Sequence, residues 1–470
     1  MDKIIGALNT VFWGYILIYG LLAVGLFFTI RLKFIQFIHF KELFRSIFDK
    51  DETDESGITP LQALTVSLAS RVGTGNLTGV AVALYLGGAG AIFWMWMVAL
   101  VGMATAYAES TLAQLYKVKD EEGTYRGGPA FYIAKGLKAK PLAVLFSISL
   151  IISFGLVFNA VQANSISEAL HNAYGFNQMY IGIGIAVVTG LVVFGGIRNI
   201  AKVAEIIVPI MALLYLLVAI YVIIANITII PDVFMQIFNS AFGLDQAAGG
   251  ITGGMIAAMM NGVKRGLFSN EAGMGSAPNI AAVATPNPHH PSSQGMVQAL
   301  GVFIDTLLIC TATAFMILLS GLLEPGSGLT GIELTQQALS AHVGAFGTHF
   351  VAIAILFFAF TSIIGNYSYA ENAFTYLGIG NKAGFTVLRI ALLIMVIWGA
   401  VQKVSTVFNA ADASMGLMAT INLVAIVLLS GTVVKLTNDY FAQRKKGIVP
   451  TFNGADYPEL KGKIDMTIWK

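Results

Sequence analysis

The chain contains about eleven long apolar runs, each near or above the roughly 17–25 residues that a helix needs to cross a bilayer. They cover approximately positions 10–30, 61–84, 92–115, 143–170, 178–195, 203–226, 246–262, 295–322, 349–376, 384–400 and 413–436. Inside lipid, backbone polar groups must be bonded within the protein, so these runs are expected to be helices. The 470 residues are 56% hydrophobic and only 11% charged, against about 25% charged in a soluble domain. The sequence therefore predicts an all-α integral membrane protein.

Composition also excludes several classes of protein. Cys310 is the only cysteine, so neither a disulfide within the chain nor a cysteine-rich metal site is expected. No basic stripe with interleaved aromatic residues is present, which argues against a nucleic-acid partner. The first apolar run lacks a basic segment followed by a small-residue cleavage site, so we expect a retained span rather than a signal peptide.

The cations predict the orientation. Nearly all of the 27 Lys and Arg residues fall in alternate loops or in the polar tail. Lys264 and Arg265 are counted with these loops. The positive-inside rule then places the C-terminus in the cytoplasm and the N-terminus outside a multi-pass protein of the cell membrane.

One apolar run is interrupted near its middle. Gly73 and Gly75 flank Thr74, and Asn76 follows; each glycine weakens a helix by roughly 1 kcal/mol. A broken helix is tolerated in a membrane only where it lines a cavity or a solvated path. The freed amides of a half-helix suit a substrate carboxylate, so these four residues are predicted to bind substrate. The alternative is close helix packing through small residues.

The hydropathy pattern also predicts the organisation. When the first span is set aside as peripheral, ten spans remain, and the first member of each set of five is rich in glycine. Five spans per half give the halves opposite orientations, which is typical of alternating-access transporters. We expect an N-terminal region at 1–60, a first five-helix repeat at 61–228, a second inverted repeat at 229–436 and a polar cytoplasmic tail at 437–470.

Further polar residues lie at mid-span. Phe158 and Gln162 are four residues apart and share a helix face, and both are predicted to contact substrate, although an interhelical polar contact is the alternative for Gln162. Asn261 is predicted to meet the substrate side chain or to cap a helix. Thr361 and Ser362 offer hard oxygen ligands for an alkali cation, unless their hydroxyls bond back to their own helix.

Two ionisable residues at mid-membrane need partners. Arg71 and Asp305 are functional candidates by default, because an isolated charge inside a bilayer is expensive, although Arg71 is not expected to bind substrate. The alternative is a structural ion pair between Arg71 and either Asp305 or Glu109. Glu271 is expected to join Lys264 and Arg265 in an inner gate.

Four blocks of sequence resemble the alanine or glycine:cation symporter family, the sodium:alanine symporters. They cover 63–81 (ALTVSLASRVGTGNLTGVA), 87–102 (GGAGAIFWMWMVALVG), 125–137 (YRGGPAFYIAKGL) and 264–279 (KRGLFSNEAGMGSAPN). The resemblance implies a LeuT-like core and transport driven by sodium, or in some members by protons. It also implies a sodium site at Thr361 and Ser362, completed by the backbone of Ala69, Val72 and Phe358.

The expected function is sodium-coupled symport of a small neutral L-amino acid, such as alanine or glycine, by alternating access. Glutamine as substrate and proton coupling remain alternatives, and a channel is the rival class. HExxH and GxSxG motifs are absent from the sequence, so an enzyme is not expected. Sodium is the only expected ion and no other cofactor is predicted. The expected partners are the amino acid and membrane lipid, without an obligate protein partner.

Overall fold

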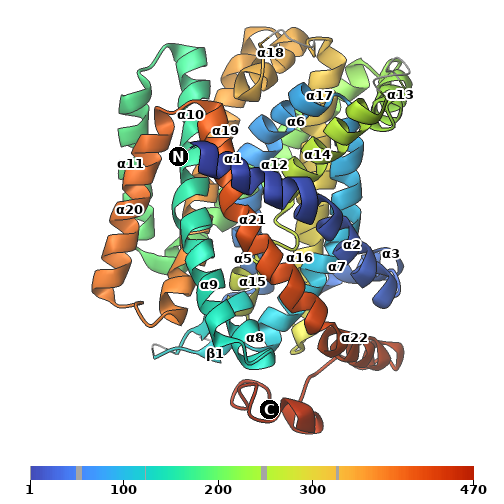
Figure 1. Cartoon of the computed structure of the whole chain (residues 1–470), viewed down its shortest axis with the longest axis vertical. Helices are drawn as coiled ribbons and strands as arrows, with labels where there is room; N and C mark the ends of the chain where they lie inside the picture. Colours follow the sequence, from blue (N-terminus) through green and yellow to red (C-terminus); the bar gives the residue numbers. More distant parts are fainter. Residues whose placement is uncertain (1, 49–55, 122, 245–250, 324–327) are drawn as a thin grey trace.

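The computed structural model describes residues 2–48, 56–121, 123–244, 251–323 and 328–470. Within these ranges the chain forms a bundle of helices with one small hairpin, in which β1 (Val118–Lys119) pairs with β2 (Tyr125–Arg126) (Figure 1). Among the described residues, eight helices are long and apolar enough to cross a membrane. The prediction of an all-α membrane protein is confirmed.

The first half of the core begins with a broken helix. A capping box at Thr59 and Gln62, with Pro60 at the first position, starts α5. The elements of this half are α5 (Pro60–Arg71), η2 (Gly75–Gly79), α6 (Val80–Gly87), α7 (Gly90–Leu115), α8 (Pro129–Gly136), α9 (Lys140–Leu150), η3 (Ile151–Val157), α10 (Phe158–Tyr174), α11 (Gln178–Val193) and α12 (Gly196–Ala225). The segments η2 and η3 are π-helical turns.

The second half also has a broken helix near its start. Its elements are α13 (Ile230–Ala241), α14 (Ile251–Asn270), α15 (Pro278–Val283), α16 (Pro291–Val302), the π-helical η4 (Phe303–Cys310), α17 (Thr311–Ser320), α18 (Gly331–Val343), α19 (Ala345–Tyr376), α20 (Lys382–Ala400) and α21 (Val404–Leu428). The two halves interlock, because α7 packs on both α14 and α16 while α10 packs on α19 and α20.

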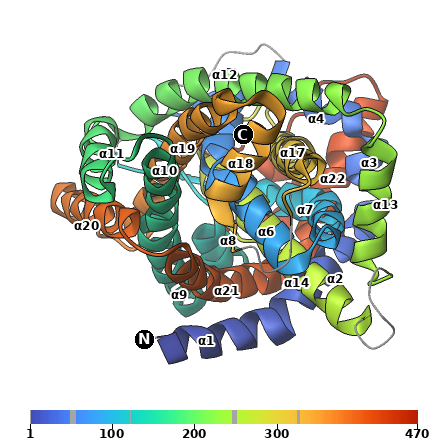
Figure 2. The same cartoon turned by 90° about the horizontal axis from the view of Figure 1, so that it is seen from above.

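Two peripheral parts complete the chain. At the N-terminus lie α1 (Asp2–Val11), η1 (Phe12–Ile16), α2 (Leu17–Arg31), α3 (Ile35–Ile38) and α4 (Phe40–Phe48). Seen from above, α1 lies at the edge of the bundle (Figure 2), where it packs on α21. At the C-terminus lie α22 (Ser430–Lys445), η5 (Gly454–Asp456) and η6 (Pro458–Leu460).

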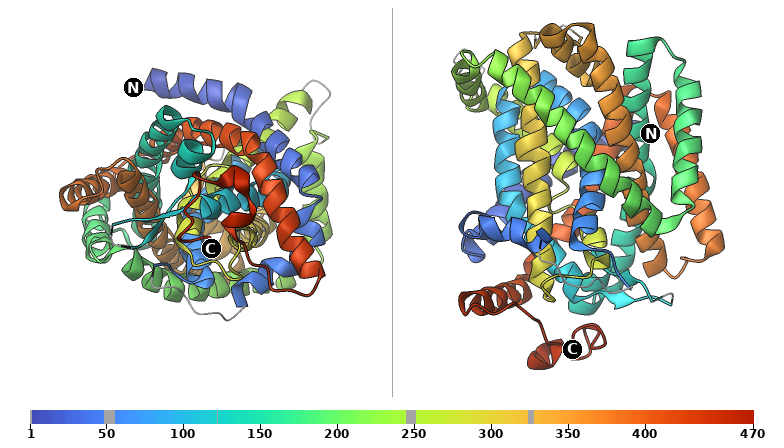
Figure 3. Two further views of the ribbon diagram at one scale, coloured as in Figure 1. Left: turned by 90° about the horizontal axis from the view of Figure 1, so that it is seen from below. Right: turned by 180° about the vertical axis from the view of Figure 1, so that it is seen from behind.

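The tail is folded against the core rather than extended from it. Figure 3 shows it across the lower face of the molecule. Trp469 is fully buried there, and its indole N–H donates to the carbonyl of Leu115 over 3.1 Å. This C-terminal face, which also carries α8 and the hairpin in Figure 1, is the face predicted to be cytoplasmic.

The two broken helices run antiparallel. Ile58, just before α5, bonds to the segment just after α15, through Ile58 N–H to Val283 carbonyl (3.2 Å) and Thr285 N–H to Ile58 carbonyl (2.9 Å). At the other end of the first broken helix, Gly87 lies against α14, where an added Cβ would be 3.0 Å from the Ala257 carbonyl. The start of one broken helix therefore lies beside the end of the other, as an inverted pair requires.

Three of the eleven predicted spans are not among the eight long apolar helices. Each of the three differs from the prediction for a structural reason. The first break divides the run at 61–84 into α5 and the shorter pieces η2 and α6. The described part of the run at 246–262 lies in α14, a continuous helix of 20 residues that carries the polar Asn261, Lys264 and Arg265, while residues 246–250 lie outside the described ranges. The third is α11, whose 16 residues fall just short of a full crossing.

The expectation for Lys264 and Arg265 is wrong. Both lie within α14, which continues to Asn270 instead of ending near Gly262. Both pair with Asp412 of α21, Lys264 over 3.4 Å and Arg265 through a close ion pair. The compensated charges allow the helix to continue through a stretch that looks like a polar loop in the sequence. The predicted region boundaries at 60, 228 and 436 remain predictions.

Candidate functional site

The first break lies in the middle of the bundle. The α5 helix ends at Arg71, and Val72 has an extended backbone with φ −78° and ψ 94° before helical geometry resumes. The N–H of Thr74 leaves the helical pattern and donates to Oε1 of Gln162 on α10 over 3.0 Å. A backbone amide freed by the break thus faces one of the predicted substrate residues.

Gly73 is where the break meets two other helices. A Cβ added there would overlap Oγ of Ser362 on α19 and lie 2.8 Å from Oε1 of Gln162. Only glycine allows the backbone to approach both side chains this closely. The structure therefore brings Gly73, Thr74, Gln162 and Ser362 together, as expected.

Asn76 holds the break in shape. Its Oδ1 accepts from the N–H of Gly73 over 2.8 Å, and its Nδ2 donates to Oδ1 of Asp305 over 2.7 Å and to the Asp305 carbonyl over 3.1 Å. Ser269 on α14 donates to the other carboxylate oxygen of Asp305 over 2.9 Å. Asn76 and Asp305 therefore tie both broken helices to η4.

The second break follows Asn270 and contains residues that the sequence analysis did not assign to the substrate site. Gly75 of the first break lies against Ser269, whose Cα would be 2.9 Å from a Cβ at Gly75. Glu271 has φ +60°, an uncommon backbone for a residue with a side chain, and its Oε1 accepts from Ser70 over 2.7 Å. The polar sequence of Ser269 to Glu271, followed by two glycines, was the available signal for this second break.

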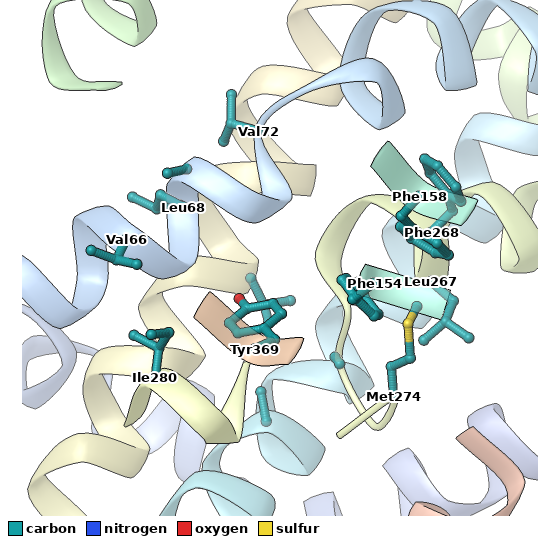
Figure 4. Packing of buried hydrophobic residues seen from close by; sticks show 14 of the residues in the cluster. Val66, Leu68, Val72, Phe154, Phe158, Leu267, Phe268, Met274, Ile280 and Tyr369 are labelled. Atoms are coloured by element: carbon teal, nitrogen blue, oxygen red, sulfur yellow. The ribbon is translucent and has the colours of Figure 1, made fainter. Parts of the chain in front are cut away.

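Aromatic rings form one wall beside the breaks. Phe158 stacks on Phe268 of α14 with ring centroids 4.7 Å apart and on Phe154 at 4.4 Å. Figure 4 shows these three rings gathered on the same side of the site. Phe268 also contacts Phe408 at 5.3 Å, and the Arg265 guanidinium lies over both Phe268 and Phe408. The ion pair between Arg265 and Asp412 therefore lies at the edge of this group of aromatic rings.

Asn261 is not brought to the breaks. Its Nδ2 donates to the carbonyl of Ala257 on its own helix over 2.9 Å, and its Cβ lies against Gly87 at the far end of α6. The helix ends nine residues later, at Asn270, so Asn261 does not cap it.

The residues predicted to bind sodium form one group of oxygen atoms. Ser362 Oγ lies 3.5 Å from the carbonyl of Val72, which the break has freed, and 3.0 Å from the carbonyl of Phe358. Thr361 Oγ1 lies 2.9 Å from the same Phe358 carbonyl. Ala69 is fully buried on the last turns of α5. Neutral hydroxyl and carbonyl oxygens fit a hard monovalent cation, although both hydroxyls here also make the back-bonds named as the alternative.

Arg71 forms neither of the ion pairs named as the alternative. The side chain is 2% exposed, and its one hydrogen bond within the described ranges is a long one of 3.3 Å from Nη1 to the Gln298 carbonyl. Glu109 instead accepts from the N–H of Gly273 (3.0 Å) and from Asn422 Nδ2 (2.7 Å), because the unwound second break needs acceptors for its amides. Glu271 bonds to Ser70 instead of forming a gate with Lys264 and Arg265.

Comparison with known proteins decides the family. The model of the sodium:alanine symporter family matches residues 1–454. The chain belongs to the sodium:alanine symporter family. The resemblance seen in the sequence is thus confirmed, and with it the transporter class.

Relatives within the sodium:alanine symporter family match along nearly the whole chain. The probable sodium/glutamine symporter GlnT of Bacillus subtilis is 49% identical over 96% of this chain and 93% of its own length. The sodium/alanine symporter AgcS of Methanococcus maripaludis is 41% identical over 94% of this chain and 98% of its own length.

The fold of this family member also matches a solved structure. MhsT, solved in complex with L-phenylalanine, aligns with a TM-score of 0.57 over 82% of this chain and 99% of its own, at 13% identity. The likeness confirms the predicted LeuT-like fold of this chain.

Proposed function

We propose that this protein is a sodium-coupled symporter that takes up a small neutral L-amino acid, such as alanine or glycine, by alternating access. The observation that carries the proposal is the meeting of a freed amide, at Thr74, with a freed carbonyl, at Val72, on the two sides of Gly73. Amides attract a carboxylate and carbonyls attract a cation. One break therefore offers adjacent places for an amino acid and for sodium.

The substrate carboxylate is assigned to the amides of the first break. Gln162 Oε1 accepts from the Thr74 N–H, and this is the kind of bond that a carboxylate oxygen would make more strongly. The role of Gln162 in the proposal is to hold this amide and to yield it to the substrate. Phe158 and Phe268 would cover the apolar side of the ligand, and the backbone of Gly75, held close to Ser269, favours a small side chain.

The sodium ion is assigned to Ala69, Val72, Phe358, Thr361 and Ser362. Its position links α5 to α19, two elements that pack closely where a Cβ at Gly365 would lie 3.0 Å from the Ser70 nitrogen. A cation between a half-helix and its neighbour would hold these elements together, which is how ion binding favours one state of an alternating-access protein.

Glutamine is the second candidate substrate. The observation that favours it is the 49% identity to a relative named a probable sodium/glutamine symporter. Both candidates share the same carboxylate and ion sites and differ in the space required next to Phe158.

A panel of radiolabelled amino acids, offered to proteoliposomes with and without an inward sodium gradient, tests the function. We expect saturable uptake of alanine or glycine that depends on the gradient. Uptake of glutamine alone would select the second candidate, and uptake proportional to concentration without saturation would indicate a channel. The proposed location is the cell membrane, with the C-terminal face in the cytoplasm.

A further inference from the structure

The buried guanidinium of Arg71 has fewer hydrogen-bond partners among the described residues than it has donors. Its Nε and Nη2 have no hydrogen-bond partner within the described ranges, and no carboxylate there lies within ion-pair distance. A charge buried in a membrane protein without partners is very costly. The Nε and Nη2 donors therefore need acceptors that the described residues do not supply.

Two glutamines of α16 have the same deficiency. The side chains of Gln294 and Gln298 are completely buried, and neither the amide nitrogen nor the carbonyl oxygen of either has a partner. An unsatisfied buried polar group destabilises a folded protein, and nearly all such groups are hydrogen-bonded to protein or to ordered water.

These unpartnered groups lie on one side of α16. His290, Gln294, Gln298 and Gly301 are spaced by four, four and three residues, which places them on one face of the helix. Gly301 marks where this face meets α5, because a Cβ added there would overlap Nη1 of Arg71 and lie 3.5 Å from Leu64. The row therefore extends from Arg71 along the boundary between α5 and α16.

The charges around Arg71 select the chemistry of the missing partner. Arg71 acts electrostatically on three buried carboxyl groups, those of Glu109, Glu271 and Asp305. An anionic ligand would duplicate the acidic groups already present around Arg71, whereas Nε and Nη2 lack only hydrogen-bond partners within the described ranges. Amide groups that both donate and accept, next to an unpartnered guanidinium, match water, which needs two to four polar partners when buried.

The geometry points to a site for bound water between α5 and α16, in which a short file of water molecules joins Arg71 to Gln298 and Gln294. At the inner end of the same face, His290 lies 3.3 Å from Asp439, whose side chain is 32% exposed. The file thus leads from the first break toward the C-terminal face. It supplies hydrogen-bond acceptors for Nε and Nη2 of Arg71.

Thermal stability of methionine variants gives the first test. Methionine has nearly the shape of glutamine without its polar atoms. If no water contacted the side-chain amides of Gln298 and Gln294, Gln298→Met and Gln294→Met would raise the melting temperature, because each would remove an unsatisfied polar group. If water satisfies them, both variants lower it. Gln336→Met is the matched control, because Gln336 is buried but bonds to the Ala169 carbonyl over 3.0 Å, and this variant should lower the melting temperature in either case.

Radiolytic footprinting of the wild-type protein gives the second test, because X-ray pulses produce hydroxyl radicals from bound water. We expect labelling of Leu64, which faces Gly301 and is 4% exposed, and none of Leu21 on α2, which is also 4% exposed. A rise in melting temperature for both methionine variants, or the absence of label on Leu64 whatever the melting temperatures, would overturn the proposal. Neither readout depends on transport, so failure here leaves the proposed symport activity untouched.

Discussion

The backbone nitrogen of Thr74 lies 3.0 Å from Oε1 of Gln162, although 88 positions separate the two residues. This bond joins the first break to α10. It places a backbone donor, which an intact α5–α6 helix would have used internally, opposite a neutral side chain that can be displaced. The proposed function depends on this exchangeable amide.

The close contact of Gly73 with Ser362 and Gln162 suggests a substitution that tests both proposed sites. In Gly73→Ala, the new Cβ would overlap Ser362 Oγ and crowd Gln162, so both proposed sites should be affected. We expect alanine binding to weaken by at least about tenfold, which corresponds to 1.4 kcal/mol. Equilibrium binding of radiolabelled alanine to purified protein measures this.

Gly184→Ala is the control for that experiment. Gly184 is an exposed helical residue of α11, and an added Cβ meets nothing within 4 Å. Its binding should equal that of the wild type. Wild-type affinity in Gly73→Ala would place the substrate away from the first break.

The hydroxyl pair on α19 predicts an effect on the ion. Removing both hydroxyls in Thr361→Ala with Ser362→Ala should raise the sodium concentration for half-maximal uptake. Loss of a ligand interaction is worth on the order of 1–3 kcal/mol, or about 5-fold to more than 100-fold in affinity. Ser362→Ala should account for most of the change, because Ser362 alone of the two reaches the Val72 carbonyl.

Ser368→Ala is the matched control on the same helix. Within the part of the chain that the structure describes, Ser368 bonds only to the Gly365 carbonyl, over 2.6 Å, so its loss should leave the sodium dependence unchanged. Should the double variant transport with unaltered sodium dependence, the two hydroxyls serve only as back-bonds within α19.

The pair between Arg265 and Asp412 should be a stabilising element. Asp412→Ala leaves both Arg265 and Lys264 without their acceptor, and Arg265 is 3% exposed. Breaking a buried ion pair in this way costs about 3–5 kcal/mol, so we expect a clearly lower melting temperature in detergent. Glu459→Ala, which removes the exposed partner of Lys435, should change nothing measurable. Equal melting temperatures for the two variants would contradict the contribution assigned to Asp412.

The sequence predicted the first break well because its signals are local. Glycines at Gly73 and Gly75 and polar side chains at Gln162 and Ser362 are conspicuous in apolar runs, and a membrane makes such residues expensive wherever they lack a role. In the structure, Gly73, Gln162 and Ser362 lie together at the first break.

Other parts of the site could not be read from the sequence. The continuation of α14 through Lys264 and Arg265 depends on Asp412, which is about 150 positions away and carries no local mark of the pairing. Phe268 and Ser269 reach the site only because α14 extends to Asn270. The positive-inside rule assigned these two cations to a loop, because it uses the positions of charges in the sequence and takes no account of ion pairs.

Orientation gives a further prediction. Lys138 follows α8 on the C-terminal face, and Lys470 ends the tail on the same face. In intact cells, Lys138→Cys and Lys470→Cys should resist a membrane-impermeant thiol reagent and react in inverted vesicles. Cys310 is buried and can stay in place, with the unaltered chain as the control. Labelling of Lys138→Cys from outside would reverse the proposed topology.

Coupled flux of sodium and alanine is the most direct measurement of the central claim. In proteoliposomes without an initial sodium gradient, alanine added outside should drive uptake of radiolabelled sodium, and the Thr361→Ala, Ser362→Ala double variant should reduce this uptake. A symporter that binds both ligands at one break predicts that neither flux occurs without the other. Alanine entry that carries no sodium, in the same vesicles, would contradict the account.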